Sequence, residues 1–339
     1  MDTMRSKIII EYNGVEATDT IAQDCNSFAW KDNASGTADT LTLGLSNLSQ
    51  RWMNGFYPSE RDTFRAWIQM QEWAADAKQG RLYCGCFMVD SLKYTGFPER
   101  LELSGISTPI NTDFNVKQKN RVWSTTTLYT ILADLTEDAG IELIFDADDV
   151  SIDSANQAGK TDLAYACGIC GEYGLSVKPY NKKLVVYDQS RYERAEAKHE
   201  ITREQMGGSG TYTIINQVTS LYDSVKIQYT DGKAGSTLTY EYTIPGRPGN
   251  RQMFLTTKAE SYADAEKKAK AALRENVRSS RKITLNKMMG SAKYLAADCF
   301  NLSGFGKLDG KYFIDSVTHT KSGGQYTISI TAHLAVTDF

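Results

Sequence analysis

Cys167 and Cys170 form a CxxC pair, a spacing used by redox dithiols and by one half of many zinc sites. A zinc site needs a second such pair or two histidines at a defined spacing, and the isolated Cys84 and Cys86 do not supply one. A redox pair usually opens a helix that follows a strand, whereas this pair lies inside a predicted helix with Leu163 on the same face. The pattern therefore favours packing cysteines over a redox or metal site.

The histidines are the second group that could act chemically, and the chain contains His199, His319 and His333. His319 and His333 lie on neighbouring predicted strands and could meet across a sheet. A catalytic role would require a nucleophile, a third ligand or a carboxylate in register with them, and the sequence indicates none. Both are therefore interpreted as polar strand residues.

An acidic cluster at residues 146–153 could be the start of a calcium loop. A loop beginning at Asp146 would need glycine at its sixth position and glutamate at its twelfth, but these are Ser151 and Gln157. A solvated loop is the better interpretation.

The glycine-rich run Gly207, Gly208, Ser209 and Gly210 lacks the following lysine and hydroxyl residue of a phosphate-binding loop, so we expect a hinge or domain joint. A glycosidase-type carboxylate pair stays open in a chain with 41 acidic residues. No catalytic residue, no cofactor-binding residue, no metal ligand and no cofactor is assigned.

The length and composition of the chain limit the classes of protein to which it can belong. The 339 residues suffice for two or three domains. With 38 basic and 41 acidic residues the net charge is −3, so no chain-wide field favours nucleic acid or an anionic membrane. The 19 tyrosines, with many threonines, serines and glycines, favour β structure and extended polar contact surfaces.

The sequence also predicts where the chain folds. No apolar run reaches the roughly 18 residues of a membrane span, and the apolar core of residues 1–10 is too short for a signal peptide. We therefore expect folding in a cytoplasm, with reduced and mostly buried cysteines instead of disulfides. The cysteines are Cys25, Cys84, Cys86, Cys167, Cys170 and Cys299.

Residues 1–110 are predicted to form a first β domain. Asn13 and Gly14 signal a hairpin turn between strands at 7–10 and 15–21. Residues 40–45 alternate leucine with threonine and glycine, the period of a half-buried strand. Residues 63–70 fit a strand or a helix, and the strand is favoured because residues 82–90 have the pattern of its hairpin partner. Further strands are expected at 27–30 and 101–105.

Residues 111–205 are predicted to form a small α+β domain. Leu128, Ile131, Leu132 and Leu135 recur at helical spacing, with Thr125 or Thr126 as a cap and Gly140 as the stop. A short strand at 142–145, a second helix from about 161 to 174 and a hairpin of 175–179 with 183–187 follow. The domain is an insertion between two β regions.

Residues 206–339 are predicted to form a second β domain with an inserted helix at about 261–278, which Ser261 can cap. β alternation is expected at 211–229 and 237–244. At the end of the chain, Tyr326, Ile328, Ile330, Ala332 and Leu334 alternate with polar residues, the signature of a half-buried strand. Residues 311–320 form its neighbour in an antiparallel meander.

Short motifs run in order along nearly the whole chain. In the first region they lie at 38–43 (Ala-Asp-Thr-Leu-Thr-Leu), Trp52, Pro58, 85–90 and 97–105. In the middle they lie at Trp123, 127–128, 131–132, 139–141, 162–165, 172–175 and 183–186. In the last region they lie at Ala263, 265–266, Ala269, 272–273, 300–306, 309–314, 317–319 and 326–327. Together with the order of elements, these motifs resemble the phage late control protein D family, the central baseplate hub of contractile phage tails and tailocins.

The sequence departs from the family at one place. The family often has a Gly-Asp pair after the proline of the first domain, whereas this chain has Ser59, Glu60, Arg61 and Asp62 after Pro58, which keeps the acid without the glycine. The last residue, Phe339, follows closely on the last predicted strand, so no fused spike or lysozyme-like extension is expected.

The resemblance implies an α+β, mainly β fold in which two antiparallel β-barrel domains of the tail-tube type flank the α+β insertion. It implies a non-enzymatic homotrimer whose barrels form a ring that joins the sixfold tail tube to the threefold central spike. The implied partners are the tail tube or tube-initiator protein, the central spike protein and baseplate wedge proteins, without specific nucleic acid binding or membrane insertion. The implied location is the baseplate of a virion or tailocin, assembled in the bacterial cytoplasm.

Two other functions stay open on the sequence. A tail-delivered cell-wall hydrolase would degrade peptidoglycan through a carboxylate that a single substitution could remove. A carbohydrate-binding tail module would use exposed aromatic residues, for which Trp52, Trp67 and Trp73 are the candidates. The sequence does not distinguish a phage from a headless tailocin.

Overall fold

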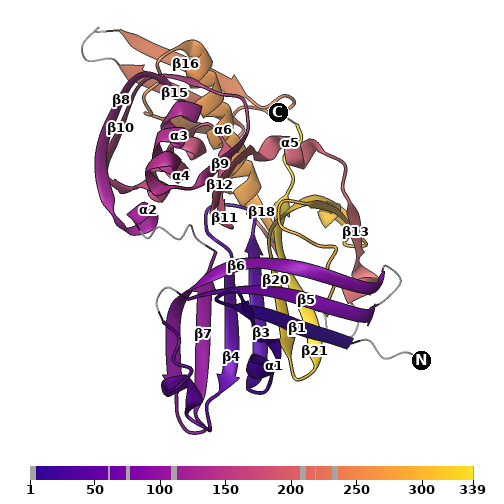
Figure 1. Ribbon diagram of the computed structural model, residues 1–339. Helices are drawn as coiled ribbons and strands as arrows, with labels where there is room; N and C mark the ends of the chain where they lie inside the picture. Colours follow the sequence, from indigo (N-terminus) through magenta and orange to yellow (C-terminus); the bar gives the residue numbers. More distant parts are fainter. Residues whose placement is uncertain are drawn as a thin grey trace.

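The computed structural model describes residues 5–59, 62–73, 77–107, 113–206, 211–217, 219–230 and 236–338, with the side chains of residues 72–79 left out of the description. It is mainly β with a minority of helix, so the predicted α+β, mainly β class is confirmed. Figure 1 shows a large sheet in the lower half of the molecule, with a helical part above it.

The large sheet, called the platform below, has 13 strands and draws on both ends of the chain. Strand β14 lies at one end of it and β1 at the other, where the two-residue β2 continues the order for a short distance. The strands from the first region are β1 (Arg5–Tyr12), β2 (Val15–Glu16), β3 (Cys25–Asn33), β4 (Thr40–Ser46), β5 (Thr63–Trp73), β6 (Ala77–Thr95) and β7 (Arg100–Ile106). Those from the last region are β13 (His199–Thr202), β14 (Thr211–Asn216), β18 (Arg281–Met289), β19 (Cys299–Ser303), β20 (Gly310–Ser322) and β21 (Gln325–Leu334).

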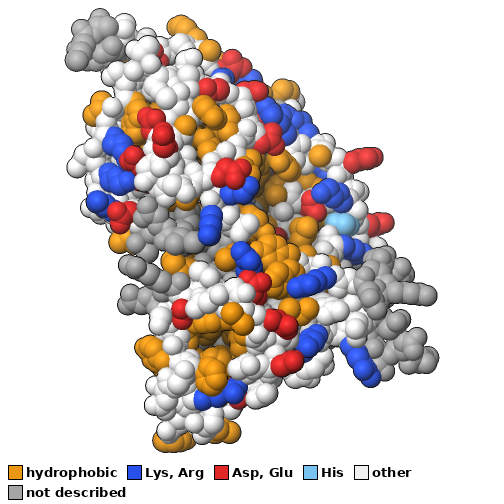
Figure 2. Space-filling model, in the orientation of Figure 1, with side chains coloured by type: hydrophobic (Ala, Val, Ile, Leu, Met, Phe, Trp, Pro, Cys, Tyr) orange, Lys and Arg blue, Asp and Glu red, His pale blue; other side chains and the backbone are white. Residues whose placement is uncertain are grey.

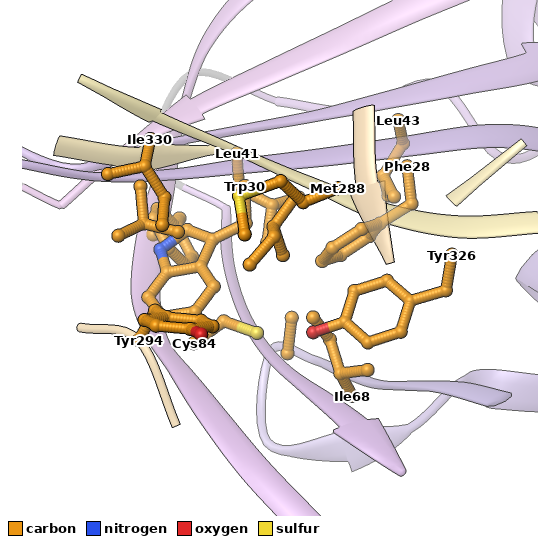
Figure 3. Close-up of a cluster of buried hydrophobic side chains, with 14 of the residues drawn as sticks. Phe28, Trp30, Leu41, Leu43, Ile68, Cys84, Met288, Tyr294, Tyr326 and Ile330 are labelled. Atoms are coloured by element: carbon orange, nitrogen blue, oxygen red, sulfur yellow. The ribbon is translucent and has the colours of Figure 1, made fainter. Parts of the chain in front are cut away.

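The two β regions meet where β3 pairs with β20. This antiparallel ladder runs from Asn33 opposite Ser316 to Ser27 opposite Ser322, and it makes one continuous sheet from strands at the two ends of the sequence. A single hydrophobic core serves both regions: Leu41 and Leu43 of β4 and Ile330 of β21 have no exposed surface and lie together in Figure 3. Residues 1–110 and 206–339, predicted as separate domains, therefore contribute to a common core.

The start of the chain differs from the predicted hairpin. The returning strand β2 is only two residues long, and the helix α1 (Thr18–Ala22) replaces the rest of the strand expected at 15–21. The Thr18 hydroxyl explains the change, because its oxygen accepts the amide hydrogen of Ile10 at 3.0 Å and so takes the place of a strand partner. Short 3₁₀ turns are η1 (Arg51–Met53), η2 (Arg203–Met206) and η3 (Gly306–Leu308).

The α+β unit comprises residues 113–194. Its elements are α2 (Asp113–Val116), β8 (Gln118–Thr127), α3 (Leu128–Ala139), β9 (Glu142–Asp146), β10 (Ser151–Thr161), α4 (Asp162–Glu172), β11 (Leu175–Tyr180), β12 (Lys183–Asp188) and α5 (Gln189–Arg194). The cap of α3 is Thr127, whose hydroxyl accepts from the Thr130 amide, instead of the expected Thr125 or Thr126. Gly140 ends this helix in the left-handed conformation at φ 64°.

The strands β8 and β10 were not predicted. They form a two-stranded ribbon that packs against α3 and α4, and polar side chains dominate both strands. The expected solvated loop at 146–153 is therefore correct only for residues 147–150, since Asp146 ends β9 and Asp153 lies in β10. Gln157 holds the ribbon to α4 by donating to Asp162 Oδ1 at 2.9 Å.

The α6 layer is a third packing unit. It consists of β15 (Ser224–Thr230), β16 (Thr237–Thr243), β17 (Gln252–Leu255) and α6 (Tyr262–Ser280), which covers the segment predicted as a helix. Ser261 caps α6 by accepting from the Asp264 amide at 3.1 Å, as expected. Its strands form a sheet of their own with a separate core around Val225, Ile227 and Leu273, whereas the sequence placed them with the platform strands.

Candidate assembly surfaces

The CxxC cysteines lie in α4, where the packing interpretation places them. All six cysteines of the chain are free thiols. Cys170 is completely buried and Cys167 is half-buried, and burial raises the pKa of both thiols. A thiol with a raised pKa stays protonated at neutral pH and is a poor nucleophile or metal ligand.

His319 and His333 do not meet across the sheet. His319 lies opposite Ile328, whereas His333 lies opposite Phe313. His319 is completely buried, stacks on Trp30 with ring centroids 4.7 Å apart, and shares a 2.8 Å hydrogen bond with the Tyr326 hydroxyl. Burial lowers the pKa of His319 to about 4, so this ring is neutral at physiological pH.

His333 belongs to a buried ionic network that the sequence did not predict. Its Nδ1 lies 2.7 Å from Asp315 Oδ1 and its Nε2 lies 2.9 Å from Glu193 Oε1, so both ring nitrogens donate to carboxylates. Burial alone would lower the pKa of His333, but the hydrogen bonds to Asp315 and Glu193 raise it. Glu193 also accepts two hydrogen bonds from Arg278 of α6, at 2.8 and 3.0 Å. The network contains no nucleophile and fastens α5 and α6 to β21.

The acidic cluster at 146–153 is divided among structural roles. Arg191 pairs with Asp146 at 3.5 Å and with Asp148 at 2.8 Å, whereas Asp149 accepts from the Tyr129 amide in the first turn of α3. Across the described residues, no group of three or more His, Cys, Asp or Glu side chains could hold a metal ion.

The tryptophan candidates for carbohydrate binding are mostly not available. Trp52 is buried, and its ring nitrogen donates to Asp24 at 2.7 Å, so the expectation that it is exposed was wrong. Trp67 is half-buried, with the Arg81 guanidinium 4.5 Å above its ring. The side chain of Trp73 and the run at 207–210 lie outside the described residues.

The first candidate assembly surface is the edge strand β14. Among the strands that the structure describes, β14 pairs with β18 alone. Its sequence, TYTIIN, has high β propensity and no charge, and Tyr212 and Ile215 are 43% and 55% exposed. Monomeric proteins usually protect such an edge with charges, proline or a covering segment, so this strand is suited to pair with another chain.

The second candidate surface is the first half of β1, at the other end of the platform. The second half is covered, because Glu11 and Tyr12 pair with β2 and Ile10 bonds to the start of α1. The residues from Ser6 to Ile8 line a cavity of about 350 Å³, together with the start of β3 and the β20–β21 turn. Within the described chain, the platform therefore ends in an incompletely paired strand on each side.

A third surface, the loop-end patch, is formed by exposed apolar side chains on two loops at the lower end of the platform. The Asn47 amide donates to the Glu99 carbonyl at 2.9 Å, and the Tyr94 hydroxyl donates to the Trp52 carbonyl at 2.7 Å, so the two loops lie side by side. Hydrophobic side chains gather at this end of the molecule in Figure 2. The patch consists of Leu48 (71% exposed), Met53 (42%), Phe56 (50%), Tyr57 (58%) and Phe97 (93%).

No described helix is both long and apolar enough to cross a membrane. No protein-family model matches the sequence, and no curated protein matches it. Solved structures, in contrast, match this chain over nearly its whole length. The tail protein from Neisseria meningitidis MC58 superposes with a TM-score of 0.71 at 12% identity, over 98% of this chain and 99% of that one. The chain shares the fold of this tail protein.

Two further structures support this fold. The 43 kDa tail protein of prophage MuSo2 from Shewanella oneidensis gives a TM-score of 0.69 at 11% identity, over 97% of this chain and 98% of that one. The E. coli c3393 protein is described as a type VI secretion component similar to the bacteriophage T4 tail proteins gp27 and gp5. It gives a TM-score of 0.59 at 10% identity, over 97% of this chain and 78% of that one. These neighbours agree with the resemblance found in the sequence.

Proposed function

We propose that this chain is a structural baseplate hub protein of a contractile phage tail or tailocin. In this role it is a trimeric adaptor that joins the sixfold tail tube to the threefold central spike. The observation that carries the proposal is the platform with an incompletely paired strand, β1 or β14, at each end of the described sheet, in a chain with a tail-protein fold.

The two edges favour a closed ring. They differ in sequence, so pairing β14 of one copy with β1 of the next is a head-to-tail contact, which closes into a ring when the rotation per copy fits. Each copy contributes two β regions joined by the β3–β20 ladder, so three copies present β regions in sixfold number and α+β units in threefold number. A ring built in this way matches sixfold symmetry on one face and threefold symmetry on the other.

The loop-end patch is the proposed contact with the next protein along the tail axis, the tube or the spike. Its exposed residues lie on loops at one end of the platform, and apolar patches on loop tips are typical of protein interfaces. Baseplate wedge proteins are proposed to contact the α+β unit. The proposed location is the tail baseplate, and no catalytic step is assigned to the chain.

Light scattering coupled to size-exclusion chromatography tests the ring. The expected mass is three times 37.7 kDa, or about 113 kDa. Ile215→Lys puts a charge on the β14 edge and is expected to give a monomer with unchanged circular dichroism. Val122→Lys is the matched control, because Val122 is 73% exposed on β8, away from both edges, and its variant is expected to remain a trimer.

A wild-type monomer that binds neither tube nor spike protein would contradict the proposal. Trimerisation of Ile215→Lys would show that the β14 edge is not the contact. Peptidoglycan lysis by the purified chain, abolished by one carboxylate substitution, would favour the hydrolase instead.

A further inference from the structure

The β11–β12 hairpin of the α+β unit is held to the platform by one buried ionic cluster. Lys178 of β11 reaches between two platform carboxylates, with its Nζ 2.7 Å from Asp32 Oδ1 and 3.1 Å from Asp39 Oδ1. The side chain of Asp39 has no exposed surface, and that of Lys178 is only 16% exposed. The cluster lies at the root of the β3–β4 loop, where the platform meets the hairpin.

Only one of the two carboxylate oxygens of Asp39 has hydrogen-bond partners. Its Oδ1 accepts from the Asn33 amide at 2.9 Å as well as from Lys178, but its buried Oδ2 has no hydrogen-bond partner. Asp32, in contrast, uses its second oxygen to accept from the Ala296 amide at 2.9 Å. An unpaired buried carboxylate oxygen is costly as an anion, and protonation lowers that cost because the neutral acid is less penalised by burial.

The groups that face the cluster do not balance its charge. Cys84 of β6 and Tyr180 of β11 interact with both carboxylates, and burial raises the pKa of each, to about 12 for Tyr180, so both are neutral. His319 of β20 faces Asp32 and is neutral as well, because burial lowers its pKa to about 4. The cluster therefore holds one ammonium ion against two carboxylates. Burial, opposed by Lys178 and reinforced by Asp32, raises the pKa of Asp39 to about 7.

The β3–β4 loop makes two more hydrogen bonds to the hairpin. The Gly36 amide donates to the Val177 carbonyl at 2.9 Å, and the Tyr187 hydroxyl donates to the Ala34 carbonyl at 3.0 Å. The acceptor Val177 is next to Lys178 in β11, and Tyr187 lies opposite Ser176 in the neighbouring strand β12. A change in the cluster therefore acts directly on the whole contact.

We propose that this joint is a pH-sensitive latch, in which the β3–β4 loop binds the β11–β12 hairpin tightly when Asp39 is protonated and more weakly when Asp39 is ionised. The sign follows from linkage: the closed joint binds the proton more tightly than the open, solvated one, so acidification toward pH 4 favours closure. The favourable contribution is lost as the pH rises through about 7. The latch operates in a single chain and does not depend on ring formation.

Hydrogen exchange of the full-length protein, corrected for the intrinsic exchange rate, tests the latch. Opening of the joint, measured at the Gly36 amide, whose hydrogen bond to the Val177 carbonyl crosses it, is expected to be about 30-fold rarer at pH 5.5 than at pH 8.5. Amides of the platform strand β4 are the internal reference and are expected to change little. In Asp39→Asn, the opening constant is expected to become independent of pH, because the titrating group is gone.

Two further variants keep the test decisive if Asp39→Asn does not fold. In Asp32→Asn, Asp39 is the only carboxylate that remains beside Lys178. Because Asp32 raises the pKa of Asp39, its removal is expected to move the midpoint of the pH dependence to lower pH. Asp19→Asn is the matched control, since the Asp19 side chain is 91% exposed, and it is expected to reproduce the wild-type profile. A wild-type profile without pH dependence at the Gly36 amide, or an Asp32→Asn midpoint equal to the wild type, would overturn the latch.

Discussion

Removing the Glu193 carboxylate is expected to destabilise the protein strongly. Glu193 has no exposed surface and accepts from Arg278 twice and from His333 once. Glu193→Ala therefore leaves the Arg278 guanidinium, whose side chain is only 7% exposed, without its buried counter-charge. A neighbouring acid, Glu275, approaches Arg278 at 3.7 Å but is 73% exposed, so water screens its attraction.

The magnitude follows from this asymmetry in burial. Breaking a buried ion pair by deleting one partner costs about 3–5 kcal/mol, because the remaining charge stays desolvated. At roughly 2 °C per kcal/mol for a chain of this length, the expected fall in Tm is about 6–10 °C. Glu275→Ala, the matched control at the same arginine, is expected to cost less than about 1 kcal/mol.

Thermal unfolding followed by circular dichroism at pH 6 measures these values. In the double variant Glu193→Ala/Arg278→Met both charges are gone, so its loss is expected to be about 1–3 kcal/mol smaller than the sum of the single losses. The raised pKa of His333 adds a pH signature. The stabilisation by protonated His333 is fully present below the unfolded pKa of about 6.5. It is lost as the pH rises through the higher pKa of the folded state. Equal losses for Glu193→Ala and Glu275→Ala would refute this account of the network.

Two more predictions concern the platform. Gly105→Ala would place a methyl group 2.4 Å from Phe64 Cζ, so the urea midpoint should fall by the equivalent of about 1–3 kcal/mol. Gly55→Ala, with no atom within 4 Å, is its control, and an unchanged Gly105→Ala midpoint would contradict the packing. Truncation after Ile328 removes the second half of β21, which lies between β18 and β20, and is expected to abolish assembly in size-exclusion chromatography. Truncation after Val336 retains the strand and should assemble, whereas a ring formed by the shorter chain would disprove the prediction.

The local features of the fold were predictable from the sequence. Ser261 with Asp264 and the apolar spacing after Leu128 identified α6 and α3, because capping and helical periodicity depend on residues a few positions apart. The hairpin of β11 and β12 was predictable for the same reason. In contrast, β8 and β10 were missed because most of their side chains are polar, and the few apolar ones that face the core, Trp123, Ile152 and Ala155, do not give a period of two.

The contacts between distant segments were not predictable. The alternation of apolar and polar residues in β3 does not identify β20 as its partner strand, because any strand with one apolar face has the same local pattern. The strands of the α6 layer alternate as the platform strands do, so the sequence did not indicate that they form a sheet of their own. Trp52 was expected at the surface because aromatic content alone does not reveal that Asp24 accepts its ring N–H in the interior.

The two buried ionic clusters attach the helical part to the platform in different ways. The network of Arg278 and His333 with Glu193 and Asp315 has equal numbers of cations and anions when His333 is protonated, and its hydrogen bonds to the two carboxylates raise the pKa of His333 against the effect of burial. The cluster of Lys178 with two carboxylates carries one excess negative charge until Asp39 takes up a proton. Hydrogen bonds between Arg278 and Glu193 lower the pKa of Glu193 and raise that of Arg278 against the effect of burial, so both stay ionised at neutral pH. The first attachment is therefore expected to stay closed at neutral pH, while the second weakens. If the joint at β11 opens, the α+β unit should pivot about α5 instead of separating from the platform.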